Sequence, residues 1–169
     1  RIFDFFTPIV FAHSKNFIEE RKKLGCTTSV FTLKNIKSPN KGQLNVVDAW
    51  SAPFPIAYGK EDLEAGAHAI SSLEAATAAL KKGEVDVLVT APIHKKSIQS
   101  DTFKFPGHTD YLNEQLEGDS LMFMVTDSLK VALMSDHIPL KEVVGYLNEE
   151  KINVKIASLE KSLSQDFGI

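Results

Sequence analysis

Apolar and polar residues follow two different periods along the chain, which predicts alternating β-strands and α-helices. Short apolar runs over residues 8–12 and 85–90 have the pattern of buried strands. Residues 30–36 alternate like a half-exposed strand, and residues 44–49 are expected to form another strand. The run 85–90 is the best candidate for a central strand buried on both faces. The segments 30–36 and 44–49 are close enough along the chain to pair as an antiparallel edge.

Helical periodicity appears in two long segments. Residues 60–82 place apolar side chains every three or four positions before Gly83, at Leu63, Ala67, Ile70, Leu73, Ala76 and Leu80. The last segment repeats the pattern at Ile152, Ile156, Leu159, Leu163 and Phe167. Shorter helices are expected after Ser14, as an N-cap, and around Pro139, as an early helical residue.

Two further strands are expected over residues 121–125 and 129–134. Together these elements predict an α/β fold with a mixed, mainly parallel sheet flanked by helices. The chain starts abruptly at Arg1 and ends one residue after Gly168, a helix-stop residue. We therefore expect residues 1–169 to form a single α/β region that is a fragment of a longer two-domain chain.

Composition narrows the class of partner. The 169 residues are 43% hydrophobic and 24% charged, with a formal net charge of -3, so a polyanion such as nucleic acid is not the expected ligand. No apolar run approaches the roughly 20 residues that span a bilayer. Cys26 is the only cysteine and cannot form an internal disulfide, which predicts a reducing compartment, the cytoplasm.

Polar groups gather where predicted strands end and helices begin, in the segments 90–95, 107–110 and 135–140. Helix N-termini offer unpaired N–H groups and a positive dipole end, so they suit anionic ligands. Lys95 can supply a point charge to a phosphate or carboxylate, or can simply solvate a short helix. His108 and Thr109 fit either an anion site or a capping motif, with Thr109 as the N-cap, and the residues alone do not separate these two interpretations.

His137 follows a predicted strand and is a candidate metal ligand, or a histidine satisfied locally at a strand end. Zinc needs three or more protein ligands in most sites, and no second ligand lies at a motif spacing, so the others must come from distant sequence or another chain. His13, His68 and Cys26 carry no such pattern, and Trp50 fits core packing. The chain has no Gly-x-Gly-x-x-Gly and no Walker motif, so no cofactor-binding residue is assigned in it.

Three segments in order carry a resemblance to a known family: Val89-Thr90-Ala91-Pro92-Ile93-x-Lys95, Phe105-Pro106-Gly107-His108-Thr109-Asp110-Tyr111-Leu112, and Leu129-x-Val131-Ala132-Leu133-x-x-x-His137-Ile138-Pro139-Leu140. The sequence resembles the 4-hydroxythreonine-4-phosphate dehydrogenases of pyridoxal phosphate (vitamin B6) biosynthesis. The similarity is strongest over residues 83–143. It implies part of the fold shared by the isocitrate and isopropylmalate dehydrogenases, without the family's N-terminal segment and C-terminal half.

The resemblance implies a function and a set of site residues. The expected reaction is the oxidation of 4-phosphohydroxy-L-threonine with NAD or NADP and a divalent metal (Zn, Mg or Co), then decarboxylation to 3-amino-2-oxopropyl phosphate. His108 and Thr109 match the substrate-binding pair, and His137 matches the first of three histidine metal ligands. The other two ligands are expected beyond Ile169, in a site shared across a homodimer, so the 169 residues alone should be inactive. The catalytic base stays unassigned.

Two departures and two alternatives accompany this interpretation. Asp136 stands where many members have threonine, and Asp110 stands where glutamate is common. A related dehydrogenase of 4-phosphoerythronate or 4-phosphothreonate would share the same three segments. A remnant that only binds a phosphorylated ligand or a partner subunit is the alternative outside catalysis.

Overall fold

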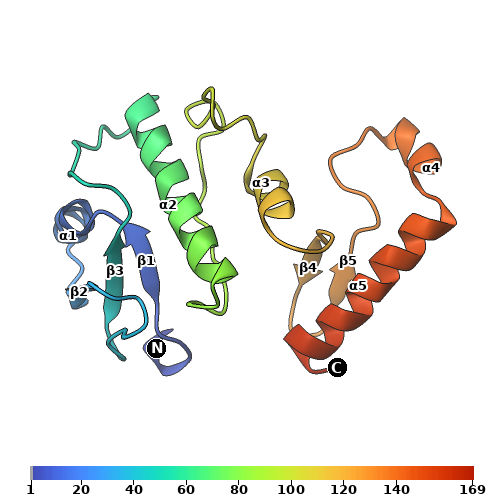
Figure 1. Cartoon of the computed structure of the whole chain (residues 1–169), viewed down its shortest axis with the longest axis horizontal. Helices are drawn as coiled ribbons and strands as arrows, with labels where there is room; N and C mark the ends of the chain where they lie inside the picture. The colour runs from blue at the N-terminus through green and yellow to red at the C-terminus, as the bar shows by residue number, and fades with distance from the viewer. Residues whose placement is uncertain (1) are drawn as a thin grey trace. The chain divides into compact units, whose positions relative to one another are not determined.

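Strands and helices alternate through the chain, which a computed structural model describes from residue 2 to residue 169 (Figure 1). The elements in order are η1 (Ile2–Asp4), β1 (Ile9–Ala12), α1 (Ser14–Lys23), β2 (Val30–Thr32), β3 (Leu44–Asp48), α2 (Leu63–Lys81), α3 (His108–Gln115), β4 (Phe123–Val125), β5 (Lys130–Ala132), η2 (Leu140–Glu142), α4 (Val143–Tyr146) and α5 (Glu149–Phe167). They form two compact units that meet in sequence after Gln115, and each is described by itself.

The sheet of the first unit has the order β1-β3-β2, and both pairings are parallel. The expectation that the second and third strands pair as an antiparallel edge is therefore wrong. The chain between them turns back over the sheet and enters β3 at the end where β2 began, with Val30 opposite Leu44. Leu33, which follows β2, is buried and donates its N–H to the Val46 carbonyl at 2.7 Å.

Asn45 holds this returning connection in place. Its side chain is fully buried; Nδ2 donates to the carbonyls of Pro8, Asn40 and Gln43 at 3.0–3.2 Å, and Oδ1 accepts from the Asn40 N–H at 2.9 Å. One side chain thus joins the loop before β3 to the residue before β1. An interaction of this kind spans 37 residues and leaves no mark in hydrophobic periodicity.

The N-cap of α1 is His13, not Ser14 as the sequence pattern suggested. The Nδ1 atom of His13 accepts from the Lys15 N–H at 3.3 Å, and the N–H of Ser14 donates to the carboxylate of Asp48 at 2.6 Å. Asp48 ends β3, so the start of α1 is fastened to the carboxyl end of the central strand. The tertiary partner shifts the cap by one residue.

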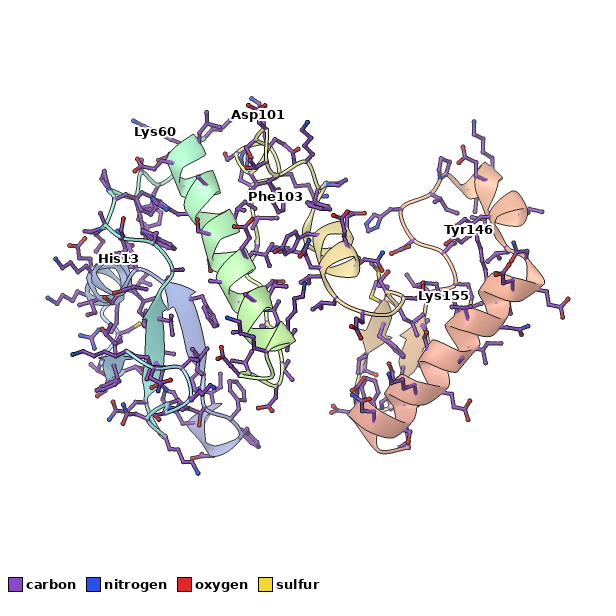
Figure 2. All side chains as sticks on the ribbon, viewed as in Figure 1. His13, Lys60, Asp101, Phe103, Tyr146 and Lys155 are labelled. Atoms are coloured by element: carbon purple, nitrogen blue, oxygen red, sulfur yellow. The ribbon has the colours of Figure 1, made fainter. Side chains whose placement is uncertain are left out.

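Helix α2 contributes more buried residues to the core of the first unit than any other helix or strand. Asp62 caps it by accepting from the N–H groups of Glu64 and Ala65. Ile70 and Leu73 are buried as the periodicity predicted, but Leu63, at the start of the stripe, is 66% exposed. The core cluster joins α2 to α3 and to the chain between them, and its Phe103 is labelled in Figure 2; the members are Ile70, Leu73, Ile98, Phe103 and Tyr111.

His13 and His68, for which the sequence predicted no functional role, take part in aromatic packing. His68 of α2 stacks on Trp50 with ring centroids 4.6 Å apart, and Phe54 lies 4.4 Å from the same imidazole. The ring centroids of His13 and Trp50 lie 6.2 Å apart, and His13 is 5% exposed. Trp50 is half-buried and packs against these rings, as the prediction of packing rather than pocket lining implies.

The strand expected over residues 85–90 is not formed. Residues 84–94 contain no strand, although Leu88 packs against the core cluster. The neighbouring side chains Val87 and Val89 are 74% and 85% exposed. The composition is that of a buried parallel strand, but a strand is assigned only where a neighbour supplies hydrogen bonds, and no residue between 2 and 169 does so here.

The second unit pairs β4 with β5 in antiparallel fashion and adds the long helix α5. The Phe167 ring of α5 lies 5.7 Å from Phe123 of β4. Within residues 116–169 no residue is buried, so the apolar stripe of α5 is only partly covered. The α/β class is confirmed, with parallel and antiparallel strands in separate sheets; no helix in the described part of the chain is long and apolar enough to cross a membrane.

Candidate functional site

A tight turn comes directly after residues 85–93, which form no helix or strand, and carries Lys95. His94 forms the turn: its carbonyl accepts from the Ser97 N–H at 3.0 Å, and its Nδ1 lies 2.7 Å from the Ser97 hydroxyl. Ser97 and Ile98 are buried, which fixes the turn to the core. The Gln99 side-chain amide donates to the Phe105 carbonyl at 2.9 Å, so the turn is also tied to the segment that leads into α3.

Helix α3 begins at His108, so Thr109 lies in its first turn and the expectation that Thr109 is the N-cap is wrong. The Gly107 carbonyl accepts the Tyr111 N–H at 3.4 Å, which places Gly107 at the capping position. A side chain at Gly107 would meet the Lys95 Cε at 4.0 Å. The structure thus brings Lys95, His108 and Thr109 to one helix N-terminus.

The electrostatics of this terminus favour an anion. The first N–H groups of a helix lack partners within it and carry the positive end of its dipole. Lys96 pairs with Glu61 at 3.1 Å, whereas no carboxylate within residues 2–169 pairs with Lys95. Asp110 lies in the same first turn and opposes an incoming anion in part. Partial burial lowers the pKa of His108 from its ordinary value, because desolvation disfavours the charged imidazolium.

His137 lies in the second unit, after β5 and before η2. It is the one residue other than glycine with a positive φ, 53°, among those described. Its side chain is 72% exposed, and Nδ1 lies 3.8 Å from a carboxylate oxygen of Asp136, beyond hydrogen-bond distance. The ring is therefore presented outward on a strained backbone, which is a common feature of functional positions.

The described residues do not complete a metal site. No group of three or more His, Cys, Asp or Glu side chains able to hold an ion occurs between residues 2 and 169. His137, with Asp136 beside it, offers at most one or two of the ligands that a divalent metal requires.

The protein is thus an α/β protein with a small polar site formed by residues 94–99 and 107–111. The site lies at a helix N-terminus beside a histidine and a lysine, and it suits an anion. The family model described as "Pyridoxal phosphate biosynthetic protein PdxA" matches residues 4–169. The chain belongs to this family.

Curated relatives carry the name 4-hydroxythreonine-4-phosphate dehydrogenase. The protein from Bacteroides thetaiotaomicron is 36% identical over 165 residues, covering 96% of this chain and 45% of the relative. The protein from a Sulfurihydrogenibium species is 32% identical over 158 residues, covering 92% of this chain and 48% of the relative. The chain therefore spans about half the length of the curated relatives it matches.

A crystal structure of a 4-hydroxythreonine-4-phosphate dehydrogenase from Burkholderia phymatum has the same fold. It superimposes with a TM-score of 0.85 at 20% identity, covering 97% of this chain and 51% of that one. A putative enzyme of this name from Salmonella typhimurium gives a TM-score of 0.81 at 22% identity, covering 92% and 50%. The predicted α/β fold is therefore confirmed, and the chain shares it with about half of each of these structures.

Several residues that build the helix terminus were not found from the sequence. Glutamine and serine are common on protein surfaces, so the sequence does not single out Gln99 and Ser97. Only the fold shows that they join the turn of Lys95 to the segment before α3. Gly66 is a second case. Its lack of a side chain leaves room for the backbone of Ser97, which lies in a different part of the chain. A glycine inside an apolar helical stripe is a signal of close approach that the sequence did offer.

Proposed function

We propose that this chain forms the substrate-binding wall of a 4-hydroxythreonine-4-phosphate dehydrogenase. The reaction is the oxidation of the secondary alcohol of 4-phosphohydroxy-L-threonine with NAD or NADP, followed by loss of CO2 to give 3-amino-2-oxopropyl phosphate. The observation that carries the proposal is the family match over residues 4–169, which includes the helix terminus at His108. The free, exposed Cys26 is compatible with the cytoplasm, where this reaction is expected.

His108 and Thr109 bind the substrate at the start of α3. A neutral imidazole donates one hydrogen bond and accepts another, so His108 can hold a hydroxyl or a carboxylate without adding charge. Thr109 is exposed and offers a hydroxyl beside the first N–H groups of the helix. Lys95, without a carboxylate partner in residues 2–169, balances the negative charge of the substrate.

His137 is one ligand of a divalent metal whose other ligands lie outside these 169 residues. Its exposure and its isolation from other ligands support a shared site, as a homodimer provides. When bound, a divalent metal supplies Lewis-acid polarisation of the substrate oxygen. By this reasoning the chain alone is inactive.

Ligand titration of the isolated chain tests the binding role without requiring turnover. 4-Phosphohydroxy-L-threonine should shift the imidazole NMR signals of His108, assigned with the variant His108→Gln, whereas unphosphorylated 4-hydroxythreonine should bind at least about tenfold more weakly because charge-assisted contacts are lost. Thr109→Val should weaken binding, and Ser71→Ala, on an exposed hydroxyl of α2, is the control. Equal affinity for both ligands, or undiminished binding by both site variants, would contradict the proposal.

Turnover distinguishes the substrates. NADH formation should appear when the chain is joined to the remaining half of the Bacteroides relative, with a divalent metal present. A side-by-side kcat/KM comparison of 4-phosphohydroxy-L-threonine, 4-phosphoerythronate and 4-phosphothreonate identifies the substrate. A preference for either of the last two would replace the assigned reaction by that of the related dehydrogenase.

A further inference from the structure

The imidazole of His94 has two nitrogens in different environments. Its Nδ1 faces the buried Ser97, 3.2 Å from the backbone nitrogen and 2.7 Å from the hydroxyl oxygen of that residue. His94 itself is exposed, and no residue between 2 and 169 bonds to its Nε2. One side of the ring is therefore held by the protein, and the other side is available to a ligand.

The contact with Ser97 fixes the tautomer of the His94 ring. A backbone N–H can only donate, so the ring nitrogen that accepts from it must carry a lone pair and no proton. A neutral imidazole without a proton on Nδ1 carries that proton on Nε2. The exposed side of His94 is therefore an N–H donor on a ring without net charge.

His13 makes the same kind of cap but lacks an exposed side. Its Nδ1 accepts from the Lys15 N–H at 3.3 Å, while the residue is 5% exposed and its ring packs against Trp50. Capping by itself thus uses only Nδ1 and is compatible with a buried ring. The exposed ring of His94 offers a second hydrogen-bonding group that its cap does not use.

The turn that carries His94 has two lysines, and only one of them is paired. Lys96 pairs with Glu61 at 3.1 Å, whereas no carboxylate within residues 2–169 pairs with Lys95. His94, in the tautomer that Ser97 fixes, adds a donor without adding charge. The turn therefore combines one unpaired ammonium group with one neutral N–H donor, which suits an oxygen atom of an anionic group.

The same turn is fastened beside the start of α3. The Gln99 side-chain amide donates to the Lys95 carbonyl at 3.4 Å and to the Phe105 carbonyl at 2.9 Å. The Lys95 Cε also lies 4.0 Å from the place that a Cβ on Gly107 would occupy. Consecutive Cα atoms are about 3.8 Å apart, so His94 is the direct neighbour of a residue that already reaches this helix terminus.

We propose that His94 is a further substrate-binding residue of the candidate site, and that its Nε2–H donates to the anionic group that Lys95 neutralises. Ser97 is the positioning residue, because it holds the ring in the tautomer with the proton on Nε2. The ligand is a small molecule with a phosphate or carboxylate group. This inference rests on the proposed function, since it adds a residue to the site of His108 and Thr109.

Calorimetric titration of the chain with inorganic phosphate tests this role. His94→Ser keeps a side-chain oxygen that can cap the Ser97 N–H, but it removes the Nε2–H donor. Phosphate binding should weaken at least about fivefold, because one hydrogen bond to an anion is lost. The midpoint of thermal unfolding should stay nearly unchanged, because the cap is kept. Nitrogen NMR of the parent chain should show the His94 proton on Nε2 and none on Nδ1.

The control is His13→Ser, the same substitution at the other histidine that caps through Nδ1. It should leave phosphate affinity unchanged, even where loss of the Trp50 contact lowers the unfolding midpoint. The proposal is overturned if His94→Ser binds phosphate as tightly as the parent, if both serine variants weaken binding equally, or if His94 carries its proton on Nδ1. If one of these results appears while Lys95→Gln still weakens binding, the proposed function stands and only the role of His94 is lost. A parent chain that does not bind phosphate would contradict both.

Discussion

Gly66 of α2 lies directly against the backbone of Ser97. A Cβ on Gly66 would overlap the Ser97 carbonyl and come within 2.9 Å of the Ser97 Cβ. Both residues are buried, so neither backbone can move aside without disturbing the core. This approach sets how deeply the turn 94–99 sits on α2, and with it the place of Lys95.

Gly66→Ala should therefore lower the free energy of unfolding of the first unit by more than about 2 kcal/mol, although alanine is the better helix former. Chemical denaturation measures the change. Gly145→Ala is the matched control, because a side chain there meets nothing within 4 Å and should be neutral or slightly stabilising. A Gly66→Ala protein as stable as the parent would show that the turn adjusts freely.

Asn45→Asp tests the side chain that organises the parallel sheet. The substitution replaces a donor to three carbonyl groups by a carboxylate in a fully buried position, so we expect a loss of about 3 kcal/mol. Asn35→Asp is the control: its exposed Oδ1 accepts from the Lys37 N–H, and aspartate keeps that bond. The control should change unfolding by less than about 0.5 kcal/mol.

His108 predicts a specific pH dependence. Burial lowers the pKa of His108 below 6.5, so the unfolded chain takes up its proton more readily than the folded one. The contribution of this residue is fully present above pH 6.5 and is lost as the pH falls from there through the folded pKa. Unfolding curves of the parent and of His108→Gln, compared across this range, should converge at acidic pH.

Inorganic phosphate should reverse the direction of that shift. An anion bound beside His108 favours the charged imidazolium and raises the pKa of His108, which an NMR titration of the ring detects. Lys95→Gln should reduce the effect. A pKa that does not respond to phosphate in the parent protein would argue against an anion at this helix terminus.

His137→Ala should abolish zinc binding and metal-dependent turnover in the complete enzyme without unfolding the second unit. The side chain is 72% exposed and makes no hydrogen bond to another described residue, so little packing is lost. His137→Gly separates the roles further, because glycine accepts φ 53° without strain and should leave thermal stability equal or higher. Calorimetric zinc titration and thermal unfolding make the comparison; unchanged zinc affinity would remove His137 from the metal site.

The sequence predicted the elements better than their partners. Local periodicity and turn residues predict helix α2, its stop at Gly83 and the two strands β4 and β5, and the structure confirms them. The antiparallel pairing of β4 with β5 was not predicted. The direction of β2 against β3 depends on Asn45, whose partners are distant in sequence. The strand at 85–90 needs a neighbour that periodicity cannot supply.

The candidate site was likewise predicted only in part from the sequence. His108 and Lys95 were placed at element ends by pattern alone, and the fold brings them to one helix terminus. The capping position, by contrast, was wrong at Thr109 as at Ser14, because backbone groups found other acceptors. The roles of His108, Thr109 and His137 remain predictions for the experiments above.

Trp50, stacked on His68, is the only tryptophan of the chain. Tryptophan fluorescence therefore reports on the first unit alone, and the unfolding of residues 116–169 does not change it. Circular dichroism, in contrast, receives a large part of its helical signal from α5. Two spectroscopic midpoints that disagree would reveal that the halves of this chain unfold as separate cooperative blocks, and a shared midpoint would mean that they unfold as one.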